Sequence, residues 1–561
     1  MASLLIRSIR YLVTCDDKDQ LLEDVDLYCE DGFIRQIGPH LDITADRTID
    51  ASHMLCYPGL VNTHHHLYQV FSRNLPQVQN MELFDWLKTL YEIWKNLDED
   101  VIRLSSLTGM GELMKHGCTT CFDHHYVFPT HAGDLIGAQF AAADTLGIRM
   151  YASRGSMDLS VKDGGLPPDS VVQTVDEIMT DSARLIEKYH DTSYGAMHRI
   201  ALAPCSPFSV SAELLRQSAI LARQYGVRLH THLCETKDEE NFMLQREGIR
   251  PLEYMERLGW TGSDVWFAHG IHFNDEELRV LAKTGTGVAH CPISNMKLSS
   301  GIARIPEMLE LGVPVGLAVD GSASNDGSSL MEELRVAFLL HRLNASRRAP
   351  TGYDVLKMAT RGSARLLGRD DIGQLAVGKC ADLFMIDSRR LELVGSCFDP
   401  KSVLGTVGVR GPVDYTVVHG RVTVAQGHLM TVDEERLAVA KAYGLALDNF
   451  CTVLYNAGST TKEAAEANDP YKACQESEAN KFIKAPPSLD HRYMHEDIGS
   501  GLLPIAELGR LAGVPTPITD AHVTLSEAMM GRDYHAEGVN LEKMGLDGKT
   551  IEQVLDYVTR G

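Results

Sequence analysis

The sequence lacks several features that would place the protein in other classes. It has no run of about 20 apolar residues, the length that a helix needs to span a bilayer. Its 53 Lys and Arg residues face 76 Asp and Glu residues, and the formal net charge of -23 argues against a nucleic-acid polymer as partner. Residues 1–13 are too charged and too short in their apolar part for a secretory signal. We therefore expect a cytoplasmic protein without membrane association.

The cysteines form no disulfide or zinc framework. Twelve cysteines are scattered along the chain, as expected for reduced thiols. The only Cys-x-x-Cys, at 118–121, has no second pair at zinc-site spacing, so we interpret it as packing. With 561 residues, 44% of them hydrophobic, the chain is long enough for two or three globular domains.

A short apolar strand at 58–63 runs into three consecutive histidines. Alternate side chains of a strand share one face, so His64 and His66 point the same way. Two imidazoles held in this way can chelate a divalent metal. Taken alone, the triplet fits a solvated histidine-rich turn equally well.

Later apolar segments end in the same manner. They lead to His232 and Glu235, to His269, to 290–295 and to Asp320, and helical segments such as 211–225, 275–283 and 305–311 lie between them. Alternating strands and helices indicate a parallel sheet covered by helices, and about eight such units predict an α/β protein with a (β/α)8 TIM barrel. Any one of these residues could be an ordinary buried histidine or a capping aspartate. At corresponding strand ends they indicate one shared site.

The motifs in this order resemble the amidohydrolase superfamily, in its aminohydrolase branch. The segments that carry the resemblance are 58–66, 230–236, 268–272, 290–295 and 319–326, and it extends over about residues 1–429. The resemblance implies the metal ligands His64, His66, His232 and Asp320. It also implies Glu235 as the proton shuttle, His269 as a polarising or water-orienting residue, and a catalytic role for Asp320 beside the water.

Three imidazoles and one carboxylate suit zinc, with iron as the alternative. Such an ion lowers the pKa of bound water, and Glu235 is close enough in sequence to His232 to move a proton. Glu235 could instead be a helix N-terminal carboxylate that satisfies the turn after 233. Relatives with two metals use a modified lysine on the fourth strand, and 199–208 contains none, so we expect one metal ion. The Pro-Cys-x-x-Cys of the other zinc deaminases is also absent.

Within this branch the chain most resembles the 8-oxoguanine deaminases, which implies conversion of 8-oxoguanine to urate and ammonia. The segments concerned are 66–69, 83–91, 123–126, 154–158 and 203–209. Gln69, Arg154 and Cys205 are candidate substrate contacts, although packing explains each of them about as well. Pterin and triazine rings present similar groups, so an aminohydrolase or chlorohydrolase of those rings is the alternative.

The barrel, expected at 58–370, is predicted to carry a small β-sandwich built from both of its flanks. Residues 1–57 alternate apolar and polar, and short glycine-punctuated strands return within 371–429. We expect this module to support the barrel and to take no part in the chemistry.

The remaining residues, 430–561, have helical character and resemble the α-helical domain of octopine/nopaline (opine) dehydrogenases. In that family the arginine at the position of Arg492 binds the substrate carboxylates, and the aspartate at the position of Asp497 belongs to a catalytic His-Asp pair. In this chain the two residues could instead pair with each other to hold the fold. No Gly-x-Gly-x-x-Gly follows a strand in this segment, so no NAD is expected. A role in homodimer contacts or in binding a small acid is expected. A non-hydrolytic opine-type oxidoreductase or a binding protein remains the alternative of a different class.

Overall fold

The computed structural model describes residues 3–434, 439, 461–462 and 495–560. The chain forms two compact units, Met1–Met430 and Thr431–Gly561. Among the described residues, no helix is both long enough and apolar enough to cross a membrane.

Eight parallel strands in the first unit form the predicted barrel. In chain order they are β6 (Leu60–Asn62), β8 (Cys118–Asp123), β9 (Arg149–Ser156), β10 (His198–Pro204), β11 (Arg228–Leu233), β12 (Val265–His269), β13 (Gly287–His290) and β14 (Val315–Leu317). Each pairs with its neighbour in sequence, and the short strands β7 (His65–His66) and β15 (Asp320–Gly321) pair in parallel beyond β6 and β14. This last pairing brings the first and last strands together, so the fold prediction is confirmed.

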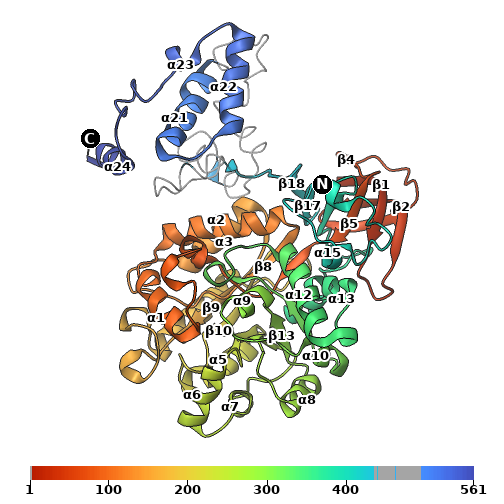
Figure 1. The fold of residues 1–561 in the computed structure, drawn as a ribbon, viewed down its shortest axis with the longest axis vertical. Helices are drawn as coiled ribbons and strands as arrows, with labels where there is room; N and C mark the ends of the chain where they lie inside the picture. Colours follow the sequence, from red (N-terminus) through yellow and green to blue (C-terminus); the bar gives the residue numbers. More distant parts are fainter. Residues whose placement is uncertain (1–2, 435–438, 440–460, 463–494, 561) are drawn as a thin grey trace. The chain divides into compact units, whose positions relative to one another are not determined.

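Helices surround the strands, whose residues are almost all buried (Figure 1). The helices are α1 (Leu83–Trp94), α2 (Glu99–Lys115), α3 (Leu135–Leu146), α4 (Val175–Tyr189), α5 (Ala212–Tyr225), α6 (Lys237–Glu247), α7 (Pro251–Arg257), α8 (Asp275–Thr284), α9 (Pro292–Lys297), α10 (Ile305–Leu311), α11 (Ser322–Asn325), α12 (Leu330–Ala345), α13 (Gly352–Lys357), α14 (Ser363–Leu366) and α15 (Val403–Thr406). Local signals set their ends. Asn274 begins α8 with a capping box, and Gly285 ends it in the left-handed conformation.

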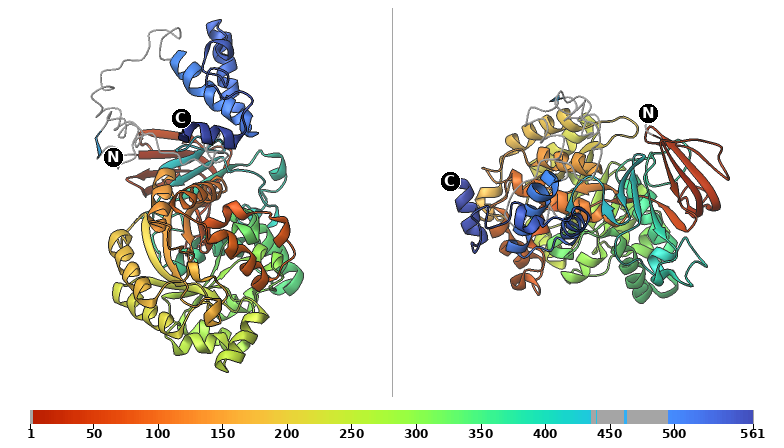
Figure 2. Two further views of the ribbon diagram at one scale, coloured as in Figure 1. Left: turned by 90° about the vertical axis from the view of Figure 1, so that its left-hand side faces the viewer. Right: turned by 90° about the horizontal axis from the view of Figure 1, so that it is seen from above.

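Strands from both flanks of the barrel combine into one mixed sheet of nine strands. They are β1 (Ser3–Val13), β2 (Leu21–Glu30), β3 (Phe33–Gly38), β4 (Arg47–Asp50), β5 (Met54–Pro58), β16 (Leu383–Asp387), β17 (Tyr415–Val418), β18 (Arg421–Ala425) and β19 (His428–Leu429). The two flanks meet where β5 pairs antiparallel with β16. Figure 2 shows this sheet beside the barrel, consistent with the predicted supporting module. A buried ion pair between Arg149 of β9 and Asp382, 3.0 Å apart, connects the barrel to the sheet.

The described part of the second unit is helical, as predicted. It contains the π-helix η8 (Asp497–Leu502) and helices α21 (Leu503–Ala512), α22 (Pro517–Met530), α23 (Tyr534–Glu537) and α24 (Ile551–Arg560). Ile498, Leu503, Val523 and Tyr534 form a small buried core. Asp497 begins η8 on the surface, whereas Arg492 lies outside the described residues.

Candidate active site

The four expected metal ligands converge at the carboxyl ends of the barrel strands: His64 and His66 follow or lie on β6 and β7, His232 lies on β11, and Asp320 begins β15. Asp320 Oδ1 lies 3.3 Å from the Nε2 atoms of both His64 and His66. The Nε2 atom of His66 lies 3.2 Å from that of His232. All four side chains are buried. The pairing of β7 with β15 brings Asp320 to His64 and His66, because it places Asp320 directly opposite His65.

The other ring nitrogen of each of these histidines is already engaged. His66 Nδ1 donates to the carbonyl of His124 at 2.7 Å, and His232 Nδ1 donates to the carbonyl of Cys205 at 2.6 Å. His64 Nδ1 lies 2.8 Å from His230 Nε2. Hydrogen bonding at Nδ1 leaves the Nε2 lone pair free, the arrangement that metal-binding histidines use.

These residues fit a divalent cation. The Nε2 atom of His64 is buried and has no hydrogen-bond partner among the described residues, although such atoms are normally satisfied. Burial lowers the pKa of His64 well below its ordinary value and that of His232 to about 3, so both rings are neutral donors. Burial opposes ionisation of Asp320, yet the neighbouring imidazoles of His64, His66 and His269 hold its pKa well below the usual range. Three imidazoles and a carboxylate are a zinc-type donor set.

Glu235 follows β11 and faces the ligands from the rim of the barrel. Its Oε2 atom lies 3.6 Å from His269 Nε2, and Ser300 Oγ donates to its Oε1 atom at 3.3 Å. Burial raises the pKa of this carboxyl, so it can hold a proton at a pH where an exposed glutamate would not. The backbone N–H groups before α6 are served by Glu239, which accepts from Cys234 and Glu235 at 2.9 and 3.0 Å. The Glu235 side chain is therefore not needed to satisfy this turn.

Together with Glu235 and the expected metal ligands, His269 forms the polar floor of the site. Its Nδ1 atom donates to Asn295 Oδ1 at 2.8 Å, and its Nε2 atom lies 3.9 Å from Asp320 Oδ2. Burial lowers the pKa of His269, but Glu235 and Asp320 outweigh burial and raise it overall. Both His269 and Asp320 have positive φ, 70° and 63°. Such backbone costs about 1–3 kcal/mol for a non-glycine residue, and active sites often contain it.

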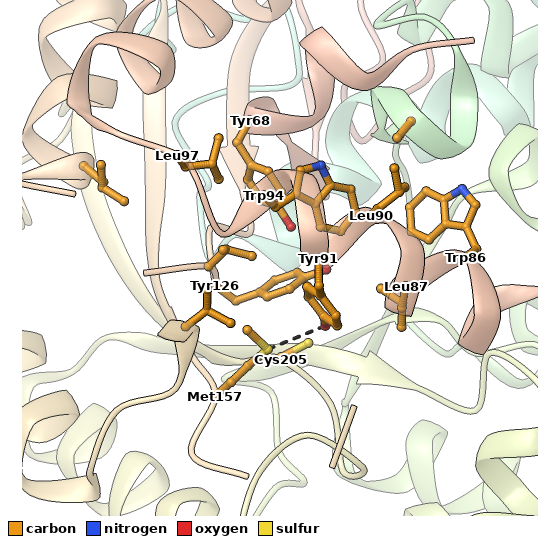
Figure 3. Close-up of a cluster of buried hydrophobic side chains, with 14 of the residues drawn as sticks. Tyr68, Trp86, Leu87, Leu90, Tyr91, Trp94, Leu97, Tyr126, Met157 and Cys205 are labelled. Atoms are coloured by element: carbon orange, nitrogen blue, oxygen red, sulfur yellow. Dashed lines mark hydrogen bonds between the residues drawn. The ribbon is translucent and has the colours of Figure 1, made fainter. Parts of the chain in front are cut away.

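A pocket opens above this floor. Its apolar walls are made by Leu83, Trp86, Leu87, Tyr126, Phe208 and Leu298. Several of these side chains belong to the buried aromatic cluster in Figure 3, where Trp86, Leu87, Tyr126 and Cys205 are labelled. Gln69 and Cys205 also line the pocket. The Gln69 side-chain oxygen accepts the backbone N–H of Ala323 at 3.2 Å, and burial raises the pKa of the Cys205 thiol to about 12.

Arg154 is not among the residues that line this pocket. Its guanidinium donates to Asp181 at 2.6 Å and to Gln173 at 2.8 Å, and it lies 3.9 Å from the centre of the Phe128 ring. In this structure Arg154 forms an ion pair with Asp181 of α4, and its expected role as a substrate contact stays a prediction.

Several site residues were not assigned from the sequence. They are Ser294, Asn295, Ser300, His124, His230 and Glu239. Two of them could have been found from the sequence. His230 precedes His232 by two residues and so shares its strand face, and His124 directly follows a buried strand. Ser294, which donates to Asp320 at 2.6 Å, depends on the fold for its placement.

Comparisons with known proteins agree with this geometry. The family model described as "Amidohydrolase family" matches residues 55–423, and the model described as "NAD/NADP octopine/nopaline dehydrogenase, alpha-helical domain" matches 415–530. The chain is 51% identical over 355 residues to an 8-oxoguanine deaminase of Pseudomonas aeruginosa, which covers 63% of this chain and 79% of the relative.

Two further similarities extend over more of the chain. A hydroxydechloroatrazine ethylaminohydrolase of Pseudomonas sp. (strain ADP) is 41% identical over 456 residues, which is 78% of this chain and 94% of the relative. The crystal structure of an atrazine chlorohydrolase from Arthrobacter aurescens TC1 complexed with zinc superposes with a TM-score of 0.76 at 34% identity, and the match covers 79% of this chain and 99% of that one.

Proposed function

The chain belongs to the amidohydrolase family and is a metal-dependent hydrolase of C–N bonds in heterocycles, and we propose that its substrate is 8-oxoguanine. The products are urate and ammonia, and the metal is zinc. The observation that carries this proposal is the position of Glu235, whose carboxylate lies 3.6 Å from His269 Nε2 across the floor of an apolar pocket. The 51% identity to an 8-oxoguanine deaminase supports the choice of ring.

The residues supply the proton transfers that such a reaction needs. A zinc ion held by His64, His66, His232 and Asp320 would supply Lewis acidity that makes water nucleophilic near neutral pH. The water oxygen bonds to ring carbon 2, and the bond from that carbon to the exocyclic nitrogen breaks. Glu235 carries one proton of the water to the ring nitrogen beside this carbon, and the other proton leaves with ammonia.

The pocket walls suit a flat ring that bears a carbonyl oxygen. The apolar side chains bury the two faces of such a ring. Trp86 lines the pocket, and its buried Nε1–H has no hydrogen-bond partner among the described residues. An unpaired buried donor costs about 1–3 kcal/mol, so a substrate oxygen that accepts from it would contribute to affinity.

The test is an assay of the full chain with 8-oxoguanine, in which urate absorbance and ammonia are followed together. We expect both products in equal amounts, and loss of activity on chelation with recovery on addition of zinc. Glu235→Gln should lower kcat by about 10²–10⁴-fold while the bound metal is retained. Asp238→Asn, on the exposed first turn of α6, is the matched control.

A hydroxylated triazine is the second candidate substrate. It is favoured by the similarity to the hydroxydechloroatrazine ethylaminohydrolase, which covers 94% of that relative. A panel with aminotriazines and isoxanthopterin separates the two. If those rings release ammonia and 8-oxoguanine gives no urate, 8-oxoguanine is rejected as the substrate, whereas the assignment as a deaminase is retained. Normal turnover by Glu235→Gln would reject the mechanism.

A further inference from the structure

His64 differs from the other two histidine ligands in what holds it. His66 and His232 each donate to a backbone carbonyl, which can only accept. His64 instead meets the imidazole of His230, whose Nε2 atom lies 2.8 Å from His64 Nδ1. An imidazole nitrogen can be either donor or acceptor, so the nitrogen of His64 that carries the proton depends on the tautomer of His230.

The tautomer of His230 is determined by Trp266. His230 Nδ1 lies 2.9 Å from the Trp266 backbone carbonyl, so this nitrogen must carry the proton. The neutral ring then has its lone pair on Nε2, which accepts the Nδ1 proton of His64. His64 is left with an unprotonated Nε2 atom, the atom that lies 3.3 Å from Asp320.

His230 has no freedom to adopt another arrangement. It is fully buried, stacked on the Trp266 ring at 4.5 Å and edge-on to Phe122 at 4.9 Å. The Trp266 indole also donates to the carbonyl of Thr63 at 3.2 Å, the residue directly before His64. Trp266 therefore fixes both the ring of His230 and the backbone that presents His64.

We propose that His230 is a positioning residue that sets metal affinity by keeping His64 in the tautomer with a free Nε2 atom. It does not touch the metal or the substrate. Outer residues of this kind typically change metal affinity by 10–100-fold when they are replaced. The proposal concerns metal binding and does not depend on which ring is the substrate.

The experiment measures the zinc dissociation constant of the metal-free full chain by competition with a chromophoric chelator. His230→Leu removes the acceptor, and we expect zinc binding to weaken by about 10–100-fold. His230→Gln retains an acceptor oxygen and should recover most of that loss. His341→Gln is the matched control: His341 is a buried histidine whose Nε2 atom lies 3.0 Å from that of His290, outside the ligand set. It should bind zinc as the parent does.

A second readout separates positioning from general destabilisation. The visible absorption of bound Co²⁺ reports ligand geometry and should change in His230→Leu but not in His341→Gln. If His230→Leu does not fold by circular dichroism, His230→Met replaces it. Parental zinc affinity in the apolar variant would overturn the proposal, and so would equal losses in the Leu and Gln variants.

Discussion

The carboxylate of Glu239 accepts the backbone N–H of Glu235 at 3.0 Å, and its second oxygen accepts that of Cys234 at 2.9 Å. Both carboxylates are buried, and Cys234 between the strand and the helix has a positive φ of 55°. Glu239 thus holds a strained segment in place. The direction in which the Glu235 side chain points depends on a residue that itself lies outside the pocket lining.

The first prediction follows from this contact. Glu239→Gln replaces one acceptor oxygen by an amide donor, so one buried N–H loses its partner. We expect a loss of about 1–3 kcal/mol in the free energy of unfolding. Displacement of Glu235 should lower kcat by up to about 10²-fold. Thermal unfolding and ammonia release measure the two effects. Asp238→Asn, one residue earlier on the exposed side of α6, should change neither, and an unaltered kcat in Glu239→Gln would contradict the positioning role.

The same residue predicts a pH dependence of stability. Burial raises the pKa of Glu239 from an ordinary 4.5 to about 7, so the folded protein binds this proton more tightly than the unfolded chain. Its contribution to stability is fully present below pH 4.5 and is lost as the pH rises through 7. The difference in melting temperature between the parent and Glu239→Gln should therefore shrink between pH 5 and pH 7.5. A difference that grows over this interval would show that the carboxyl ionises more readily when folded.

The convergence of the expected metal ligands could be predicted because repeated strand–helix units bring all strand ends to one face of the barrel. His66, His232 and Asp320 are far apart in sequence but occupy equivalent positions in their units. The partners of these ligands were harder to predict. Asn295 and Ser294 come from a six-residue helix whose direction is set by packing, and no periodic pattern encodes it.

Arg154 illustrates the limit in the other direction. Its place at the end of β9 suggested a substrate contact, yet the carboxylate of Asp181 reaches it from α4, 27 residues further on. A strand-end position is shared by residues that face the pocket and residues that face the covering helices. The choice between the two depends on which helix face packs there, and this is a tertiary property.

Replacement of Arg154 tests this placement. Arg154→Met removes charged hydrogen bonds that a buried guanidinium makes to Asp181 and Gln173, which are worth about 1.5–3 kcal/mol. We expect a lower melting temperature and an unchanged KM. Arg184→Met is the matched control, because Arg184 pairs with the same Asp181 carboxylate from a half-exposed position. Its effect should stay below about 1 kcal/mol. A raised KM without loss of stability would instead support Arg154 as a substrate contact.

The last prediction concerns the second unit. Every site residue described lies between His64 and Ser324, and the buried clusters around the barrel and the nine-strand sheet are made of residues before Met430. A chain that ends at Met430 should therefore fold and release ammonia with the kcat of the full chain per bound metal. Circular dichroism, metal analysis and the urate assay measure the three properties.

A matched variant of the full chain separates loss of the second unit from change within it. Tyr534→Phe removes the hydroxyl that lies 2.6 Å from His495 Nδ1 and keeps the ring in the small core of that unit. We expect it to leave the urate assay unchanged. A shortened chain that binds metal but turns over slowly would assign the second unit a part in catalysis. Oxidation of NADPH by the full chain with pyruvate and an amino acid would support the opine-type alternative, which the missing dinucleotide motif argues against.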